Sequence, residues 1–327
     1  MNILVTGGAG YIGSFMTKAL LDREDRVVVV DSLERGSRNA VDRRASFVKL
    51  DIRNLASLED LFCEYRFDAV FHFAGYIAVE ESSKIPQKYY ENNVVGSKNL
   101  FISAIRIGKV KKFVFSSSAA VYGNPVKIPI PESHPKNPTS IYGENKLAVE
   151  KILGSLHAER ESIGYVCLRY FNASGAALDG SMGENHDPET HIIPLVIQAA
   201  LNETSFNLFG TDYKTPDGTC VRDYIHVLDL IEAHMLALEK LKKELGGFYY
   251  NVGTGQGYSN RHIIDLIKKV SGKKLTVVEK KRRMGDPDQL VADPTNIKKE
   301  LGFKTLYSDI ETIIESAWKW HKKQFEI

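Results

Sequence analysis

Residues 2–13, with the sequence Asn-Ile-Leu-Val-Thr-Gly-Gly-Ala-Gly-Tyr-Ile-Gly, decide the fold of this chain. The apolar residues 3–5 are typical of a buried parallel strand, and glycines follow at positions 7, 8, 10 and 13. The pattern of residues 14–21 then predicts a helix. Strand, glycine turn and helix in this order form a place where a pyrophosphate can approach the backbone at the positive end of the helix.

The next strand indicates which dinucleotide such a turn would bind. Residues 27–30 are all valine, and Asp31 follows them directly. A carboxylate at the end of this strand can bind the ribose hydroxyls of the adenosine, and it would repel a 2′-phosphate. We therefore expect NAD rather than NADP as the cofactor.

Strands alternate with helices through the first half of the chain. Further strands are predicted near residues 46–50, 69–73, 112–116 and 165–170, and helices near 55–65, 86–107 and 142–162. This alternation indicates an α/β fold, a Rossmann-type doubly wound parallel sheet. We place the NAD-binding domain at residues 1–172.

The second half of the chain has a different pattern. Helices are predicted near residues 194–201, 228–241 and 260–270, with short strands around 207 and 221. We expect a smaller α/β substrate-binding C-terminal lobe at 173–327, interleaved with the first because a strand near 249–253 returns to it.

Residues 142–146, Tyr-Gly-Glu-Asn-Lys, offer a device for proton transfer. A tyrosine hydroxyl has a pKa of about 10 and can act as a base at neutral pH only if positive charge stabilises the phenolate. Lys146 lies one helical turn beyond Tyr142 and can supply that charge. Ser118 ends an apolar strand and could hydrogen-bond the oxygen whose proton Tyr142 removes. The structural alternatives are a turn cap for Ser118, packing for Tyr142 and a surface position for Lys146.

The composition narrows the class of protein. The chain has 327 residues, 43% of them apolar, and a net charge of +2, which suits a large core in two lobes and implies no nucleic-acid or membrane partner. Cys63, Cys167, Cys220 and the nine histidines show no metal-ligand spacing, so we expect reduced thiols and no metal. Residues 2–6 are a core strand rather than a signal peptide, and no apolar run approaches the length of a membrane span. We expect a soluble cytoplasmic protein.

Taken together, these motifs match a known family. Residues 6–13, 72–75, 92–93, 116–123 and 142–146, with Asp31, resemble the extended short-chain dehydrogenases/reductases. Residues 168–172, 210–213, 282–286 and above all 216–226, Pro-Asp-Gly-Thr-Cys-Val-Arg-Asp-Tyr-Ile-His, are similar to the UDP-glucose 4-epimerase branch of that family. The resemblance covers nearly the whole chain.

The resemblance implies an isomerase of carbohydrate and galactose metabolism that interconverts UDP-glucose and UDP-galactose through a 4-keto intermediate. Tyr142 would take the proton of the sugar 4-hydroxyl while C4 gives its hydride to NAD. The keto sugar would turn about its link to UDP, and the hydride would return to the opposite face. Positive charge from Lys146 and from the nicotinamide would lower the pKa of Tyr142.

The same resemblance implies the residues of the site. The catalytic residues would be Tyr142, Lys146 and Ser118. The cofactor-binding residues would be Gly7, Gly10, Tyr11, Ile12, Gly13, Asp31, Asp51, Ile52, Phe73, Ala74, Gly75, Asn93, Ser116, Tyr142, Lys146 and Tyr170. The substrate-binding residues would be Ser118, Asn172, His191, Phe209, Arg222, Arg283, Asp286 and Leu290.

Alternatives stay open for some of these residues. An arginine fork suits a diphosphate, but Arg222 and Arg283 could instead form salt bridges with Asp223 or Asp286. Asn93 would lie near the nicotinamide or sugar, or else cap a helix.

Four positions depart from the usual pattern of the family. Phe15 stands where histidine is common, Ile77 where many members carry a lysine near the cofactor, and His191 where many have asparagine. Leu290 takes the place of the gate of the sugar pocket, where tyrosine is associated with UDP-glucose and UDP-galactose alone. Leucine is intermediate in size between tyrosine and the smaller residues associated with the N-acetyl sugars. We therefore expect turnover of UDP-glucose and UDP-galactose, with UDP-GlcNAc and UDP-GalNAc as further candidate substrates.

Three other functions compete on the same fold. Sugar-nucleotide 4,6-dehydratases place carboxylates directly after the position of Ser118, where this chain has Ala119 and Ala120. A UDP-glucuronate epimerase or decarboxylase stays open, because recognition of a uronate is hard to predict from sequence. A non-catalytic NAD-sensing protein would be expected to lose Tyr142 or Lys146. The family commonly forms homodimers through the helices predicted near 86–107 and 142–162, and we expect the same here.

Overall fold

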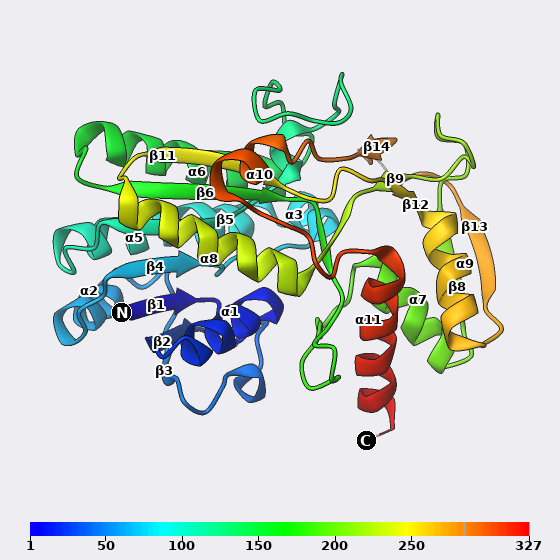
Figure 1. Ribbon diagram of the computed structural model, residues 1–327, viewed down its shortest axis with the longest axis horizontal. Coiled ribbons are helices and arrows are strands. Elements are labelled where there is room, and N and C mark those ends of the chain that lie inside the picture. The colour runs from blue at the N-terminus through cyan, green and yellow to red at the C-terminus, as the bar shows by residue number, and fades with distance from the viewer. Residues whose placement is uncertain (284–285, 327) are drawn as a thin grey trace. The chain divides into compact units, whose positions relative to one another are not determined.

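The computed structural model describes residues 1–283 and 286–326 (Figure 1). The chain divides into two compact units that alternate along the sequence. The first unit comprises Met1–Gly123, Pro135–Arg169 and Ile231–Tyr250. The second comprises Asn124–His134, Tyr170–Leu230 and the described residues from Asn251 onward. The boundary predicted at residue 172 lies close to Tyr170, where one segment of the second unit begins.

A seven-stranded sheet organises the first part of the fold. Its order is β11-β6-β5-β4-β1-β2-β3. The strands are β1 (Asn2–Thr6), β2 (Arg26–Asp31), β3 (Ser46–Lys49), β4 (Ala69–His72), β5 (Lys112–Ser118), β6 (Gly164–Tyr170) and β11 (Gly247–Val252). The chain leaves β1 toward one side of the sheet and resumes on the other side at β4, which creates a crevice at the carboxyl ends of these two strands. The predicted Rossmann-type fold class is confirmed, and the strand predicted near 249–253 is β11.

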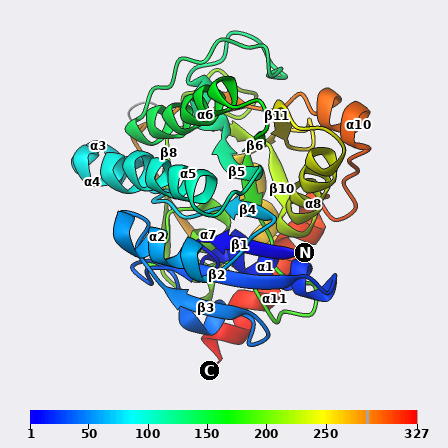
Figure 2. The ribbon, with the colours of Figure 1, turned by 90° about the vertical axis from the view of Figure 1, so that its left-hand side faces the viewer.

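Helices cover both faces of this sheet. Figure 2 shows α2 (Leu55–Glu64), α5 (Gly96–Arg106) and α6 (Ile141–Glu159) on one face, with α1 (Tyr11–Asp22) and α8 (Val227–Lys243) on the other. The apolar faces of α2, α5 and α6 pack on the strands around fully buried phenylalanines such as Phe62, Phe101 and Phe113. Burial of such rings supplies the main driving force for this layer.

The helix predicted near 86–107 is a run of three segments. It begins as α4 (Pro86–Tyr90), passes through a π-helical turn (Glu91–Val95) and ends as α5. The short helix α3 (Val79–Lys84) and the 3-10 turns η1 (Arg38–Ala40) and η3 (Ala119–Tyr122) were not predicted. Asn93 lies in this π-helical turn and its side chain is buried, facing the segment after β4.

The second unit has three small sheets and four helices among its described residues. The sheets pair β7 (Asn172–Ser174) with β10 (Tyr224–His226), β8 (Ser205–Phe209) with β13 (Thr276–Lys280), and β9 (Val221–Arg222) with both β12 (Tyr258–Ser259) and β14 (Gln289–Leu290). The helices are α7 (Ile192–Leu201), α9 (Asn260–Ser271), α10 (Thr295–Leu301) and α11 (Ile310–Phe325). The helices α7, α9 and α11 share one apolar core. The helices predicted near 194–201 and 260–270 are confirmed, whereas α10 and α11 were not predicted.

Two composition-based expectations can be compared with the structure. All three cysteines are free thiols, of which Cys167 and Cys220 are buried and Cys63 is exposed. Within the part of the chain that the structure describes, no helix combines the length and apolar character needed to cross a membrane.

A buried ion pair fixes α6 against the sheet. Glu150 on α6 and Arg169 on β6 are only 2% and 1% exposed, and Arg169 donates to the two carboxylate oxygens at 2.8 and 2.6 Å. Ser117 on β5 donates to the same carboxylate at 2.6 Å, and Tyr122 accepts from Arg169 at 3.0 Å. A bidentate pair with its remaining groups satisfied is the geometry in which burial of charge can be sustained.

We predict that Glu150→Gln lowers the free energy of unfolding by about 3–5 kcal/mol, because it leaves the Arg169 charge buried without its partner. Equilibrium urea denaturation measures the loss. The control is Glu80→Gln, which removes an exposed helix pair with Lys84 and is expected to cost no more than about 0.5 kcal/mol. Equal losses in the two variants would contradict this account.

Candidate active site

The glycine turn brings β1, β4 and α1 into close contact. Gly7 has a φ of +74°, and a Cβ there would meet the backbone nitrogen of Ala74 at 2.5 Å. A Cβ at Gly13 would collide with the carbonyl oxygen of Gly7, so neither position tolerates a side chain. The helix α1 begins at Tyr11, immediately after this turn. The backbone is therefore open to a phosphate group at the helix N-terminus.

Asp31 lies beside the glycine turn. Its carboxylate accepts hydrogen bonds from the backbone nitrogens of Ala9 at 3.1 Å and Leu33 at 2.8 Å. Burial raises the pKa of Asp31 above its usual value, although both hydrogen bonds act in the opposite direction. The carboxylate is thus held at the end of β2, where the sequence predicted it.

Asp51 and Ile52 follow β3. Arg53 holds the Asp51 carboxylate, with Nε 2.9 Å from each of its oxygens, and lowers the pKa of Asp51. Ile52 is buried, and a Cβ at Gly96 would meet its side chain at 2.8 Å. These contacts place both predicted cofactor residues at the same carboxyl edge of the sheet as Asp31.

A buried polar chain fixes the segment after β4. His72 lies 2.7 Å from the hydroxyls of both Thr6 and Ser97, and Ser97 donates to the backbone of Asn93. Burial lowers the pKa of His72 to about 3, so its imidazole is neutral. The Asn93 side chain in turn accepts a hydrogen bond from the backbone nitrogen of Tyr76 at 2.8 Å and donates one to the backbone oxygen of Tyr76 at 2.9 Å.

For Asn93 the structure decides against one of the two predicted alternatives, the helix cap. It does not cap a helix, because it lies inside the π-helical turn. Its contacts hold the backbone at Tyr76, and its side-chain oxygen lies 3.3 Å from where a Cβ on Gly75 would be. Asn93 thus shapes the segment of Phe73, Ala74 and Gly75 from behind.

Tyr142, Lys146 and Ser118 come together at the end of β5. The Ser118 side chain lies close enough to Tyr142 to lower its pKa. The Nζ atom of Lys146 lies 5.7 Å from the centre of the Tyr142 ring and donates to the backbone oxygen of Ser116 at 2.7 Å. The capping alternative for Ser118 holds as well, since its hydroxyl accepts from the nitrogen of Ala120. Lys146 is buried, which excludes the surface alternative.

Burial dominates the pKa of Tyr142 in the polypeptide. It raises that pKa to about 12, although the interaction with Ser118 lowers it in part. Burial also lowers the pKa of Lys146 to about 8, against the opposing effect of Glu150. The lowering of the Tyr142 pKa expected from Lys146 and the nicotinamide together stays a prediction.

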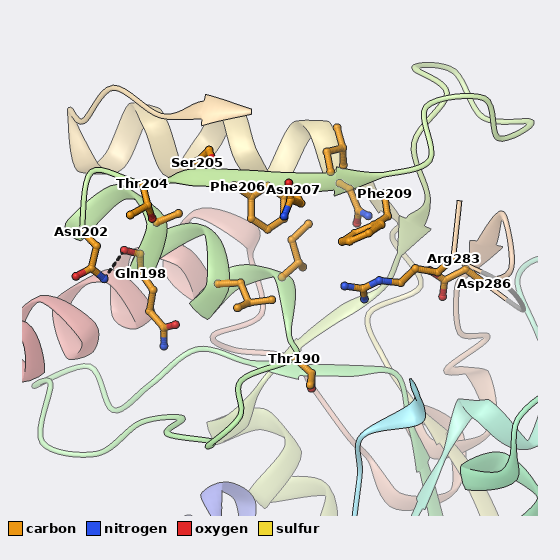
Figure 3. Close-up of a pocket in the computed structure, with 15 residues that line it drawn as sticks. Thr190, Gln198, Asn202, Thr204, Ser205, Phe206, Asn207, Phe209, Arg283 and Asp286 are labelled. Atoms are coloured by element: carbon orange, nitrogen blue, oxygen red, sulfur yellow. Dashed lines mark hydrogen bonds between the residues drawn. The ribbon is translucent and has the colours of Figure 1, made fainter. Parts of the chain in front are cut away.

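The second unit contains a pocket of about 500 Å³. Figure 3 shows three predicted substrate residues, Phe209, Arg283 and Asp286, gathered at one end of it. The guanidinium of Arg283 lies over the Phe209 ring, 4.2 Å from its centre. The volume lies in the range of small-molecule sites, and the lining combines apolar, aromatic and charged side chains.

Arg222 lies on β9, beside this group. It donates to the backbone oxygens of Val221 and Pro287 at 2.9 Å, and its Nη2 lies 3.6 Å from Asp286. The salt-bridge alternative for Arg222 is thus observed with Asp286. Leu290 on β14 is aligned with Arg222 in the sheet and is half-buried. Asn172 begins β7, and its backbone nitrogen donates to the backbone oxygen of Asp223 at 2.9 Å.

The remaining predicted residues have simpler surroundings. Tyr170 is buried at the end of β6, and Ser116 is buried on β5. Phe15 packs edge-on against Tyr11 at 5.7 Å, and Ile77 is 37% exposed.

His191 belongs to a cluster that the sequence analysis overlooked. Its Nδ1 lies 2.6 Å from Glu184, and Glu189 and His186 complete the group. The expectation that the histidines show no metal-ligand pattern is wrong for this segment, since four potential ligands occur between residues 184 and 191. Their spacing, Glu-x-His-x-x-Glu-x-His, is the signal that was available.

Comparisons with known proteins agree with this geometry. Residues 3–253 match the NAD dependent epimerase/dehydratase family. The UDP-glucose 4-epimerase of Lactobacillus helveticus is 46% identical, over 98% of this chain and 97% of the relative. The structure of UDP-glucose 4-epimerase from Brucella ovis in complex with NAD is 46% identical and superposes with a TM-score of 0.92, covering 97% of both chains. The Bifidobacterium longum UDP-glucose 4-epimerase in complex with NAD+ and UDP is 38% identical, with a TM-score of 0.94 over 99% of this chain and 98% of that one. The chain therefore belongs to the NAD dependent epimerase/dehydratase family, among the UDP-glucose 4-epimerases.

Proposed function

We propose that this chain is an NAD-dependent 4-epimerase that interconverts UDP-glucose and UDP-galactose. The observation that carries the proposal is the group of Tyr142, Ser118 and Lys146 at the carboxyl end of β5. Relatives and solved structures named UDP-glucose 4-epimerase over nearly the full chain support it.

The glycine turn supports NAD as the cofactor. The cradle at Gly7 and Gly13, which a Cβ would fill, suits a pyrophosphate, and the Asp31 carboxylate suits the ribose hydroxyls. Around them we assign Gly10, Tyr11, Ile12, Asp51, Ile52, Phe73, Ala74, Gly75, Asn93, Ser116 and Tyr170 to the cofactor, together with the catalytic Tyr142 and Lys146. When bound there, the cofactor would supply reversible hydride transfer at C4 of the sugar.

Tyr142 performs the proton transfer in this proposal. Its phenolate takes the proton of the sugar 4-hydroxyl as the C4–H bond breaks and the carbonyl forms, and it returns that proton when C4 is reduced again. Ser118 hydrogen-bonds the same sugar oxygen, and Lys146 stabilises the phenolate. Because the polypeptide alone raises the pKa of Tyr142 to about 12, further positive charge is needed, and the oxidised nicotinamide is cationic.

The second unit supplies groups that suit a nucleoside diphosphate. We assign Arg222 and Arg283 to the diphosphate, because guanidinium groups make paired, charge-assisted hydrogen bonds to phosphate. We assign Phe209, which carries Arg283 over its ring, to the uracil, and Asp286 keeps Arg222 in place. Asn172, His191 and Leu290 complete the assigned substrate residues.

We further propose a homodimer in the cytoplasm. The segment of α4 and the π-helical turn exposes Ile85, Tyr90 and Val95 by 39%, 49% and 37%, and apolar faces of this kind mark protein contacts. The three free cysteines suit a reducing compartment. Sedimentation equilibrium, which gives the molar mass in solution, tests the dimer.

NMR of the purified protein with UDP-galactose tests the proposed reaction. We expect conversion to UDP-glucose, and a fall in kcat of about 10²–10⁴-fold in Tyr142→Phe, because the base is lost. Tyr65→Phe, at the C-terminal cap of α2, is the matched control and should retain full activity. Retained NAD in Tyr142→Phe would show that the fold is intact. Absence of conversion by the wild type with NAD supplied would reject the reaction and favour a uronate substrate or a sensor.

The charge of Lys146 predicts a change in the pH profile. With a pKa of about 8, Lys146 is positively charged below that pH. A cation favours the phenolate, so its removal in Lys146→Met raises the Tyr142 pKa, by about one unit or more. We expect the acid limb of kcat/KM to move to higher pH by that amount. Lys151→Met, on the same helix but exposed, should leave the profile unchanged, and an equal shift in both variants would refute the assignment.

Leu290 predicts the range of sugars. If this side chain gates the sugar pocket, Leu290→Tyr narrows it, and the ratio of kcat/KM for UDP-GalNAc to that for UDP-galactose should fall by about tenfold or more. The same NMR assay with both sugars measures the ratio. Leu306→Tyr, at a position that is 73% exposed, is the control. An unchanged ratio in Leu290→Tyr would eliminate the gate.

A further inference from the structure

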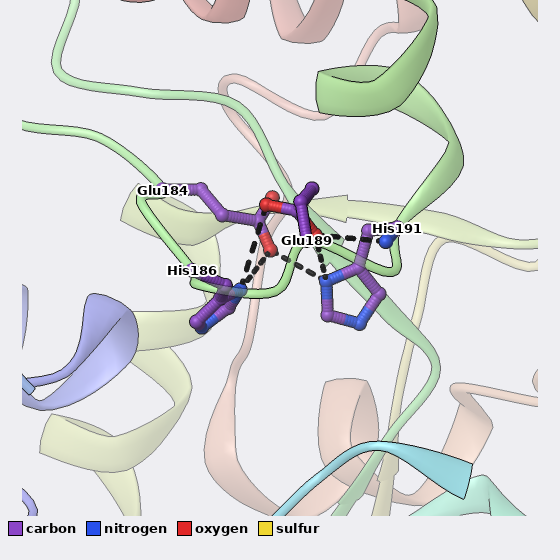
Figure 4. Close-up of side chains that lie close together, drawn as sticks. All are labelled: Glu184, His186, Glu189 and His191. Atoms are coloured by element: carbon purple, nitrogen blue, oxygen red, sulfur yellow. Dashed lines mark hydrogen bonds and ion pairs between the residues drawn. The ribbon is translucent and has the colours of Figure 1, made fainter. Parts of the chain in front are cut away.

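Four side chains of the loop before α7 converge on one point. Glu184, His186, Glu189 and His191 each direct a ligand atom inward, and these four atoms lie within 4.8 Å of one another. Figure 4 shows both carboxylates between the two imidazole rings. All four residues belong to the second unit.

The spacing of these atoms matches a small coordination sphere. Glu184 Oε1 lies 2.6 Å from His191 Nδ1 and 3.1 Å from His186 Nδ1. Glu189 lies 3.5 Å from His191 Nδ1 and 3.7 Å from His186 Nδ1. Bonds of about 2.0–2.1 Å from a tetrahedral zinc ion give ligand–ligand distances of about 3.3 Å. The four atoms therefore need only small side-chain shifts to surround an ion.

The charges of the cluster suit a divalent cation. Both carboxylates are nearly buried, with Glu184 and Glu189 side chains 4% and 5% exposed. Two carboxylates and two neutral imidazoles around a divalent ion would make an electrically neutral group.

The backbone holds the ligands in place. Glu189 Oε1 accepts from the nitrogens of Thr190 at 2.6 Å and His191 at 2.8 Å. The Glu184 carbonyl accepts from the indole of Trp320 on α11 at 2.9 Å. The neighbouring ring of His321 on α11 is buried, and burial lowers its pKa, so it adds no competing positive charge. Outer contacts of this kind orient metal ligands.

We propose that Glu184, His186, Glu189 and His191 form a binding site for one divalent transition-metal ion, with Zn²⁺ as the best fit. Two imidazole nitrogens and two carboxylate oxygens are donors that Zn²⁺ accepts, whereas Mg²⁺ and Ca²⁺ favour sites made of oxygen alone. The site lies at the start of α7, and Thr190, between two of the ligands, lines the pocket with Phe209 and Arg283. An ion here would fix that wall of the pocket. The site goes beyond the proposed epimerase reaction and does not depend on it.

Zinc binding to the full-length protein, first freed of metal with a chelator, tests the site. Competition with a chromophoric zinc indicator gives the affinity and the number of ions. We expect one tightly bound Zn²⁺ per chain that Mg²⁺ in excess does not displace. His186→Gln should weaken binding by about tenfold or more. His262→Gln removes an exposed histidine of α9 and should bind as the wild type does.

Two results would overturn the site. Failure of the wild type to take up zinc at one ion per chain would show that the cluster is a metal-free ion-pair network. Equal losses of zinc affinity in His186→Gln and His262→Gln would instead indicate zinc binding scattered over the surface. X-ray absorption of the zinc-loaded wild type keeps the test decisive even if His186→Gln fails to fold. Two imidazole nitrogens in the coordination shell support the site, and a shell of oxygens alone rejects it.

Discussion

The arrangement of the first unit depends on the buried ion pair between Glu150 and Arg169. Removing two charges from water is costly, and this pair is sustained only because Ser117 and Tyr122 satisfy its remaining groups. One carboxylate thereby ties α6 to β5 and β6. Since Lys146 is one turn before Glu150 on the same helix, the pair that positions α6 also sets where the lysine points. The Glu150 charge further opposes the loss of the Lys146 proton.

Burial has opposite effects on the two reactive groups of the site. It raises the pKa of Tyr142 and lowers that of Lys146, so in both cases it disfavours the charged form. A phenolate paired with an ammonium is nevertheless the arrangement that proton abstraction requires. The interaction with Ser118 and the carboxylate of Glu150 act against burial, each on one partner. The site is therefore arranged so that modest additional positive charge shifts the pair toward its reactive form.

Local sequence patterns were sufficient to predict the sheet, the glycine turn and the grouping of Ser118, Tyr142 and Lys146. Each rests on residues close in sequence or on the shared edge of parallel strands, as with Asp31 beside the turn. Interactions across long separations were not predictable in this way. Asn93 faces inward because a π-helical turn interrupts its helix. Arg283 lies over Phe209 because β13, which ends shortly before Arg283, pairs with β8. The extent to which burial raises the pKa of Tyr142 was not predictable in this way either, because burial is a property of the whole fold.

The cluster before α7 shows a further limit of pattern reading. Glu184, His186, Glu189 and His191 are close in sequence, yet their spacing fits neither a helix face nor a strand face, so no regular element predicts that they converge. The loop brings them together through two hydrogen bonds. The indole of Trp320 on α11 donates to the Glu184 carbonyl, and the Glu189 carboxylate accepts from the backbone nitrogen of His191. The same backbone continues directly into α7, whose residues line the pocket. Occupancy of the cluster and the shape of the pocket wall are therefore linked through a single short segment of chain.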